Sequence, residues 1–283
     1  MSATFDIRPV SPTLGAEIIG LDLSRPLEPD TVDALAAALD AHLVLVFRGQ
    51  TLSDADLVRY SAAFGRLDKA PITEHGRLHA PGFEEVYIIS NLTEQGRPIG
   101  ALGAGESAWH ADMTYLEQPP FGSCLYALEV PEEGGDTGFI SMHAAYDALP
   151  EDLRRRVDGL TLKHDSTTNS GGYLRQGFAP PVDVSASPGT IHPLVITNPR
   201  NGRRALLLGR RLNAYIPGLS VAESEALLDA IWAEAVRPDL AWHHRWRVGD
   251  LVMWDNRWTM HRRDPFPDHQ RRRMHRTQIG APH

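Results

Sequence analysis

Three residues have side chains that could bind a single metal ion: His110, Asp112 and, much later in the chain, His261. On an extended segment, residues i and i+2 face the same side, so His110 and Asp112 can both point at one ion. His261 can complete the set. Two imidazoles and one carboxylate leave three positions of an octahedron open, which suits Fe(II) that binds a bidentate co-substrate and then O₂. The three residue types therefore predict both a metal and a chemistry.

The His-x-Asp pair is weak evidence when it is taken alone. A chain with 13 histidines and 36 acidic residues contains about one or two such pairs by chance. A surface or helix-capping role is then the ordinary interpretation. The same three ligands could also hold zinc and a hydrolytic water. The metal hypothesis therefore depends on what else accompanies the three residues.

A cluster of arginines follows His261 and adds to the metal hypothesis. Arg272, Met274 and Arg276 alternate along a strand-like run, so their side chains share one face. Two guanidinium groups on one face can bind a dicarboxylate at the end away from a metal, because arginine pairs well with carboxylates. The alternative is a solvated run of charge, since three arginines are consecutive at positions 271–273.

The elements that must position these residues are mostly strands. Apolar spacing and capping residues predict helices over 30–41, from Ser53 to Gly65, and after Ser220. The β-branched or alternating runs predict strands at His42–Phe47, Val86–Ser90, Ser123–Leu128, Leu194–Thr197, Ala205–Leu208, Leu251–Trp254 and Met274–Gln278. Many strands without regular β-α alternation favour an antiparallel sandwich or barrel with helices outside. Long loops, which often cover active sites, are predicted at Thr73–Glu85 and Ser166–Ile191.

Length and composition exclude several classes of protein. The 283 residues show no repeat and no linker, so we expect one domain over 1–283. The net charge of −8, from 28 basic and 36 acidic residues, argues against a nucleic-acid partner. No apolar run reaches the roughly 18 residues of a membrane span. A single cysteine, Cys124, and a beginning without signal-peptide features predict a cytoplasmic protein.

Several segments together resemble one known family. These segments are Trp109–Tyr115, Gly134-Gly135-Asp136-Thr137, Trp254-Asp255-Asn256-Arg257, His261 and Met274-His275-Arg276-Thr277. In order and spacing they are similar to the Fe(II)/2-oxoglutarate-dependent dioxygenases of the taurine and 2,4-dichlorophenoxyacetate dioxygenase family. The resemblance extends over roughly the whole chain. It implies a mainly β protein with flanking helices, built on a double-stranded β-helix (a jelly roll, cupin-like).

The resemblance also implies roles for individual residues. His110, Asp112 and His261 would be the iron ligands, and Thr137 with Arg272 would hold the distal carboxylate of 2-oxoglutarate. A carboxylate at position 112 favours hydroxylation, because related halogenases leave that ligand position vacant. The implied reaction consumes O₂ and 2-oxoglutarate, hydroxylates a C–H bond and releases succinate and CO₂.

The implied substrate is a small, anionic organic molecule such as a sulfonate, sulfate ester, aryloxyalkanoate or amino-acid-like compound. Arg276 would lie nearer the metal-side carboxylate of 2-oxoglutarate and could also meet an anionic group of the substrate. Glu106, Tyr173 and Arg175 are further candidate substrate contacts. Family members are commonly dimers or tetramers, so a homodimer or homotetramer is expected. A zinc hydrolase and a non-catalytic dicarboxylate-binding protein on the same fold remain the alternatives.

Overall fold

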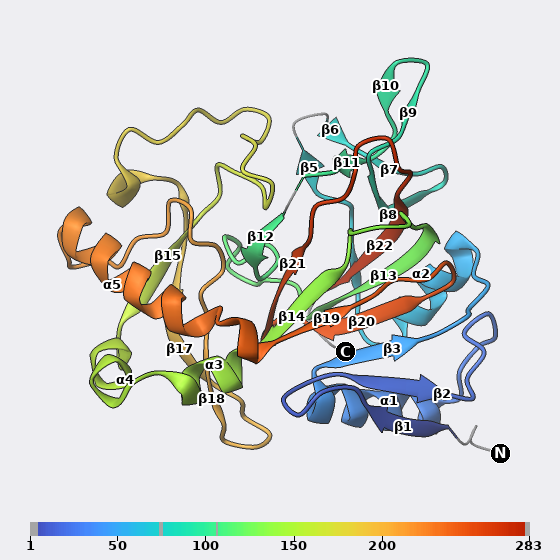
Figure 1. Cartoon of the computed structure of the whole chain (residues 1–283), viewed down its shortest axis with the longest axis horizontal. Helices are drawn as coiled ribbons and strands as arrows, with labels where there is room; N and C mark the ends of the chain where they lie inside the picture. The colour runs from blue at the N-terminus through green and yellow to red at the C-terminus, as the bar shows by residue number, and fades with distance from the viewer. Residues whose placement is uncertain (1–4, 74–75, 106, 281–283) are drawn as a thin grey trace.

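The structure is a computed structural model that describes residues 5–73, 76–105 and 107–280. Most of its strands belong to two sheets (Figure 1). The larger sheet has ten strands in the order β1 (Asp6–Pro9), β2 (Ala16–Ile19), β3 (Val44–Phe47), β20 (Leu251–Asp255), β13 (Gly122–Glu129), β22 (Arg273–Ile279), β8 (Phe83–Ser90) and β11 (Ala101–Leu102), with β4 (Leu67–Asp68) beside β22 and β7 (His79–Ala80) beside β8. The smaller sheet has the order β12 (Ser107–His110), β21 (Thr259–Arg263), β14 (Thr137–Ser141) and β19 (Ala241–His244).

The two sheets pack face to face across an apolar core. The ring of Phe139, on β14 of the smaller sheet, lies 5.7 Å from the ring of Trp254, on β20 of the larger one. Trp254 in turn lies 4.8 Å from His261 of β21. All three side chains are buried. Strand pairing is antiparallel except for β2 with β3 and β11 with β8. The prediction of a mainly antiparallel β protein with helices outside is therefore confirmed in its main features.

The three predicted helices are confirmed, and two short helices were missed. The predicted helices are α1 (Pro29–His42), α2 (Asp54–Ala62) and α5 (Val221–Ala235). The missed helices are α3 (Met142–Ala148) and α4 (Glu151–Val157), and short 3₁₀ turns occur at η1 (Val184–Ala186) and η2 (Pro238–Leu240). Helices of two turns carry too short an apolar pattern to predict from spacing, because packing rather than propensity stabilises them.

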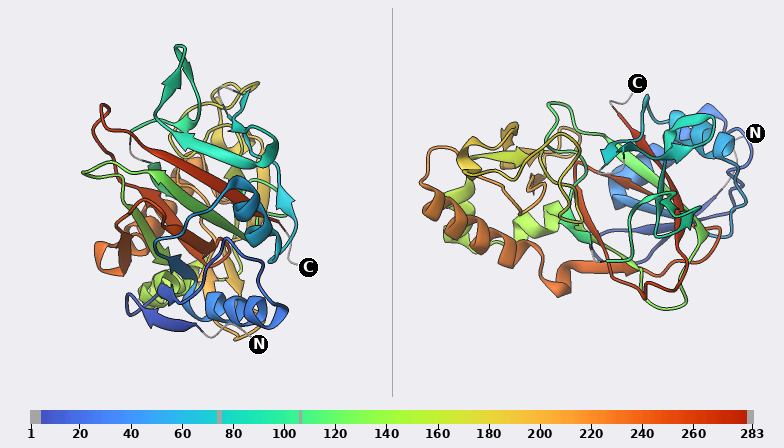
Figure 2. Two further views of the ribbon diagram at one scale, coloured as in Figure 1. Left: turned by 90° about the vertical axis from the view of Figure 1, so that its right-hand side faces the viewer. Right: turned by 90° about the horizontal axis from the view of Figure 1, so that it is seen from above.

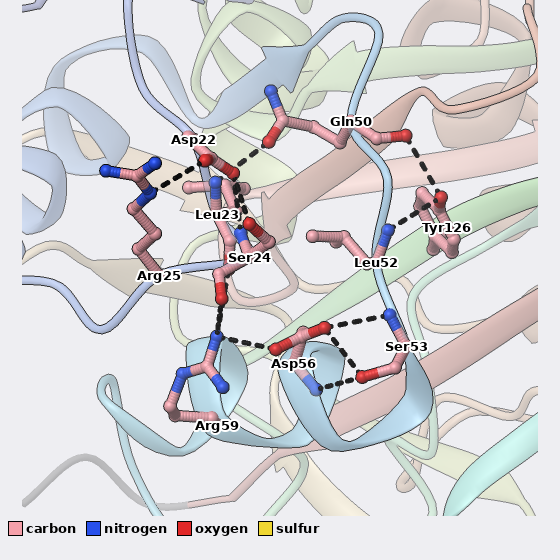
Figure 3. Close-up of polar contacts among 10 residues, drawn as sticks. All are labelled: Asp22, Leu23, Ser24, Arg25, Gln50, Leu52, Ser53, Asp56, Arg59 and Tyr126. Atoms are coloured by element: carbon pink, nitrogen blue, oxygen red, sulfur yellow. Dashed lines mark hydrogen bonds and ion pairs between the residues drawn. The ribbon is translucent and has the colours of Figure 1, made fainter.

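The capping box predicted at the start of α2 is present, and it lies beside a link to the larger sheet (Figure 3). The Ser53 hydroxyl accepts a hydrogen bond from the main-chain N–H of Asp56, and the Asp56 carboxylate accepts one from the N–H of Ser53. Just before this cap, the Tyr126 hydroxyl of β13 accepts from the N–H of Leu52 and donates to the carbonyl of Gln50, both at 3.0 Å. These bonds fix the entry to α2 against β13.

The predicted strands are confirmed as β3, β8, β13, β17 (Val195–Thr197), β18 (Arg204–Leu206), β20 and β22, with ends shifted by up to three residues.

The predicted long loops were wrong in part. The first contains β6 (Gly76–Arg77), which pairs with β5 (Ile72–Thr73), and β7. The second contains η1 and the beginning of β16 (Gly189–Pro193), which pairs with β15 (Thr161–Asp165). A further hairpin joins β9 (Thr93–Glu94) and β10 (Arg97–Pro98). Such short strands depend on their partners and show little pattern of their own.

The segment from α4 to α5 lies to one side of the two sheets, as Figure 1 and the right-hand view of Figure 2 show. It contains β15 to β18 and the helix α5. Within the described ranges, no helix is long and apolar enough to cross a membrane.

Candidate active site

The three predicted metal ligands lie together between the two sheets. His110 ends β12 and stands directly opposite His261 of β21, with 4.2 Å between their ring centroids. Asp112 follows two residues after His110. Its carboxylate oxygens lie 3.5 Å from Nε2 of His110 and 3.8 Å from Nε2 of His261. One ligand atom from each residue lies within 4.8 Å of the others, and all three side chains are buried. The group could therefore hold one metal ion.

Neighbouring hydrogen bonds orient these ligands. Nδ1 of His110 lies 2.7 Å from the carbonyl oxygen of Ala108, so the ring donates there and leaves Nε2 free to bind a metal. The Asn256 side chain accepts from the main-chain N–H of Asp112 at 2.7 Å and donates to its carbonyl at 2.9 Å. Asn256 belongs to one of the motifs that carry the family resemblance, but nothing in the sequence predicted this contact, which joins residues 144 positions apart.

The charge of Asp112 is balanced within the site. Nη2 of Arg276, on β22, lies 2.6 Å from Oδ2 of Asp112, and the Ser123 hydroxyl lies 3.5 Å from the same oxygen. Burial by itself raises the pKa of Asp112, but Arg276 and the two histidines outweigh it and hold the pKa well below its usual range. Burial and the neighbouring His110 lower the pKa of His261 well below its usual value. The site therefore presents a carboxylate and a neutral imidazole.

A cationic cavity adjoins the metal ligands. His110, His261, Thr137, Arg272 and Arg263 all line it. Arg272 is only 2% exposed, yet among the described residues no carboxylate pairs with it and its Nε has no hydrogen-bond partner. Burial lowers the pKa of Arg272 well below its ordinary value, and the neighbouring Arg263 lowers it further. A buried, unpaired guanidinium is costly, so this arrangement suits a bound anion.

Two residues that the sequence did not single out support this cavity. The indole N–H of Trp246 donates to the Thr137 hydroxyl at 2.9 Å, which leaves the hydroxyl proton available to the cavity. Arg263 donates to the carbonyl oxygens of Leu102 and Gly105, and burial lowers its pKa to about 10. Trp246 lies far from Thr137 in sequence, and Arg263 belongs to a pair of neighbouring arginines in which neither stands out.

A second pocket is lined by Asp112 itself. Arg276, Arg175 and Arg210 line it, together with Pro71, Ile72 and Thr73. The Arg175 guanidinium stacks 3.8 Å from the ring centroid of Tyr115, and Arg210 lies 5.8 Å from the same ring. The sequence did not indicate Arg210, because two consecutive arginines after a short strand are usually exposed to solvent.

The remaining predicted substrate contacts have different outcomes. Arg175 lines the pocket beside Asp112, and its role as a substrate contact stays a prediction. Tyr173 is 55% exposed and does not line that pocket. Glu106 lies outside the described residues. The structure thus brings together the ligands, Thr137, Arg272, Arg276 and Arg175, and it leaves Tyr173 at the surface.

Comparison with known proteins gives a consistent picture. The model of the family described as taurine catabolism dioxygenase TauD, TfdA family matches residues 6–278. An (S)-phenoxypropionate/alpha-ketoglutarate-dioxygenase of Sphingobium herbicidovorans is 35% identical, over 99% of this chain and 96% of its own length. An alpha-ketoglutarate-dependent 2,4-dichlorophenoxyacetate dioxygenase of Cupriavidus pinatubonensis is 34% identical, over 95% of each chain.

A solved structure of a protein named AAD-2, in complex with Mn(II) and N-oxalylglycine, superposes with a TM-score of 0.80. It is 30% identical, and the match covers 99% of this chain and 98% of that one. The His-Asp-His group, the adjoining cationic cavity and these relatives agree with one another. The chain therefore belongs to the TauD/TfdA family and is a 2-oxoglutarate-dependent dioxygenase.

Proposed function

We propose that this protein is an Fe(II)-dependent hydroxylase that converts 2-oxoglutarate and O₂ to succinate and CO₂ while it hydroxylates a C–H bond of a small organic anion. His110, Asp112 and His261 hold the iron. The observation that carries the proposal is Arg272, a buried guanidinium without a carboxylate partner among the described residues, on the same cavity as His110 and His261. A zinc hydrolase has no use for such a group.

The three ligands fit Fe(II) by their chemistry. Two neutral imidazoles and one carboxylate form the ligand set of non-haem iron oxygenases, which leaves positions for a chelating co-substrate and O₂. Once bound, iron with 2-oxoglutarate supplies the oxidant that removes hydrogen from the substrate. The chain's own part is to orient the ligands. The bond from His110 to Ala108 fixes one ring, and Asn256 fixes the main chain of Asp112.

Arg272 and Thr137 bind the distal carboxylate of 2-oxoglutarate. The guanidinium supplies charge and paired N–H donors, and the Thr137 hydroxyl donates a further bond because Trp246 already occupies its oxygen. Arg263 adds a second positive charge on the same cavity. Neutralising Arg272 on binding also removes the cost of burying it alone.

The substrate is anionic because the pocket beside Asp112 is cationic. Arg276, Arg175 and Arg210 line it. Arg276 is engaged with Asp112 at 2.6 Å, whereas Arg175 and Arg210 have no carboxylate partner among the described residues. A sulfonate, sulfate ester, aryloxyalkanoate or amino-acid-like compound would meet this requirement. The named substrates of the two relatives, phenoxypropionate and 2,4-dichlorophenoxyacetate, are aryloxyalkanoates.

Further features of the protein belong to the same proposal. The two facing sheets form a double-stranded β-helix of the jelly-roll, cupin-like kind, within a single domain over 1–283. We expect a homodimer or homotetramer, in line with the family, and a location in the cytoplasm.

The test is an anaerobic optical titration of the metal-free protein with Fe(II) and 2-oxoglutarate. We expect a weak visible charge-transfer band of the iron chelate that is lost in Asp112→Ala and His261→Ala, followed by O₂-dependent succinate release with a small anionic substrate. Tight zinc binding without a band, and hydrolysis without O₂, would favour the hydrolase. A charge-transfer band without succinate release, whichever substrate is added, would favour a dicarboxylate-binding protein.

A further inference from the structure

The turn that follows the metal ligand Asp112 has an unusual main-chain conformation. Met113 adopts a φ of +49°, in the left-handed region that residues other than glycine seldom occupy. The N–H of Leu116 donates to the carbonyl of Met113 at 3.0 Å and closes the turn. Such a conformation persists only where the surrounding structure holds it, and it is found most often at functional sites. Contacts with other parts of the chain must therefore fix this turn.

The hairpin of β15 and β16 supplies these contacts. Nε2 of His192 lies 2.9 Å from the carbonyl oxygens of both Thr114 and Leu116, so this nitrogen carries a proton and donates to them. The Thr190 hydroxyl donates to the carbonyl of Tyr115 at 2.7 Å. The carbonyls of three successive residues are thus bonded to one strand, β16. Its partner β15 lies on the side of β12 that is away from the larger sheet (Figure 1).

The same hairpin fixes the main chain that carries Arg210. Nδ1 of His164, on β15, lies 3.0 Å from the Thr114 hydroxyl, and both side chains are buried. Gly209 passes directly beside this pair with a φ of +61°, and a Cβ there would overlap both side chains. The carbonyl of Gly209 also accepts from the N–H of Ala111 at 2.9 Å. Arg210 therefore leaves the main chain at a point that is fixed against the metal-ligand segment.

The Tyr115 ring lies against two arginines that line the pocket beside Asp112. Its centroid is 3.8 Å from the Arg175 guanidinium and 5.8 Å from that of Arg210, within the distance at which an aromatic face attracts a cation. The two guanidiniums repel each other: burial and then the charge of Arg175 lower the pKa of Arg210 to about 10. Arg210 also donates to the carbonyl of Thr168. Arg175 therefore depends more strongly on the ring.

We infer that Tyr115 is a positioning residue for the substrate, because its ring holds the guanidiniums of Arg175 and Arg210 where an anionic group in the pocket beside Asp112 meets both. An arginine that is already held loses less conformational freedom when it binds an anion, so the affinity for the anion is higher. The inference rests on the proposed function, which makes this pocket a substrate site. It adds that the preference for an anion depends on an aromatic ring.

The first experiment compares an anion with its neutral counterpart. Phenoxyacetate and phenoxyacetamide are similar in shape and differ in charge, and each is titrated into the protein loaded with Mn(II) and 2-oxoglutarate. The unmodified protein should bind the acid at least tenfold more tightly than the amide. In Tyr115→Leu, which the half-buried position tolerates, the affinity for the acid should fall about 5- to 30-fold. The affinities for the amide and for 2-oxoglutarate should stay nearly the same.

Two further variants separate the ring from the hydroxyl and from general destabilisation. Tyr115→Phe keeps the aromatic face, so its preference for the acid should lie within about twofold of that of the unmodified protein. Tyr146→Leu is the matched control, because the Tyr146 ring also lies against two arginines, Arg154 at 5.5 Å and Arg204 at 4.8 Å. Tyr146 does not line the pocket beside Asp112, and its loss should leave both affinities unchanged.

A double variant tests whether Tyr115 acts through the arginine that it holds. Arg175→Met should lower the affinity for the acid about 10- to 150-fold, since it removes a charge-assisted contact. Adding Tyr115→Leu to Arg175→Met should lower it by less than threefold more, because the ring then has only Arg210 left to hold. Residues that act as a unit give losses that are not additive.

Four results would overturn the inference: no preference for the acid in the unmodified protein, equal losses for acid and amide in Tyr115→Leu, the same loss in Tyr146→Leu, or additive losses in the double variant. Failure of the proposed function looks different. A preference for the acid that depends on Tyr115, without a charge-transfer band or succinate release, would contradict the function and keep the positioning role. Succinate release with an acid affinity that Tyr115→Leu leaves unchanged would do the reverse.

Discussion

Replacing Arg272 by methionine tests how much the buried charge of this residue destabilises the protein, and whether the residue binds 2-oxoglutarate. The guanidinium is 2% exposed, lacks a carboxylate partner among the described residues, and lies near a second buried arginine, Arg263. Methionine has a similar length and no charge. Replacing buried ions by apolar groups of similar volume often stabilises a protein by about 1–4 kcal/mol. We therefore expect metal-free Arg272→Met to be more stable than the unmodified protein by an amount in this range.

The same substitution should weaken binding of 2-oxoglutarate. A hydrogen bond to a charged group contributes about 1.5–3 kcal/mol. Its loss corresponds to an increase in Kd of about 10- to 150-fold. A higher free energy of unfolding in the metal-free variant, together with a lower affinity for 2-oxoglutarate, would show that Arg272 serves binding and not stability.

The assay combines urea unfolding of the metal-free protein with calorimetric titration of 2-oxoglutarate into the Mn(II)-loaded protein. Arg271→Met is the matched control, because Arg271 is the neighbouring residue, is largely exposed and pairs with Glu129 at 2.6 Å. An exposed ion pair contributes little, so the control should leave both quantities nearly unchanged. An Arg272→Met protein that is less stable and binds 2-oxoglutarate normally would refute the reasoning.

Asn256→Ala removes both bonds to the main chain of Asp112 and should weaken Mn(II) binding about 10- to 100-fold by calorimetry; unchanged affinity would mean that the loop is held by other contacts. Trp246→Phe should raise the KM for 2-oxoglutarate about fivefold with metal affinity unchanged, because the Thr137 hydroxyl loses a bond that contributes about 1 kcal/mol. Burial lowers the pKa of His164 from 6.5 to about 3, so the unfolded chain binds its proton more readily. The free energy of unfolding should accordingly fall by about 2 kcal/mol from this group between pH 7 and pH 5, and urea unfolding of His164→Gln should lack that part of the pH dependence.

The sequence by itself determined the features that depend on short stretches of chain. The capping boxes at Ser53 and Ser220 start their helices because side chain and main chain satisfy one another within four residues. The His-x-Asp spacing likewise sets His110 and Asp112 within reach of one ion. Several separated motifs in the order of a known family then indicated the partner His261 and the role of Arg272.

Tertiary structure alone decided which contacts between distant residues support the site. Arg276 reaches Asp112 because β22 faces the smaller sheet, and Trp246 reaches Thr137 across 109 positions of the chain. Tyr173 and Arg175 are near neighbours in sequence, yet only Arg175 faces the pocket. Such contacts depend on how whole sheets and loops pack, and a local pattern of residue types does not encode a pairing between segments so far apart. A cavity of about 710 Å³ beside α5 was hidden for the same reason, since its walls come from five separate segments of the chain.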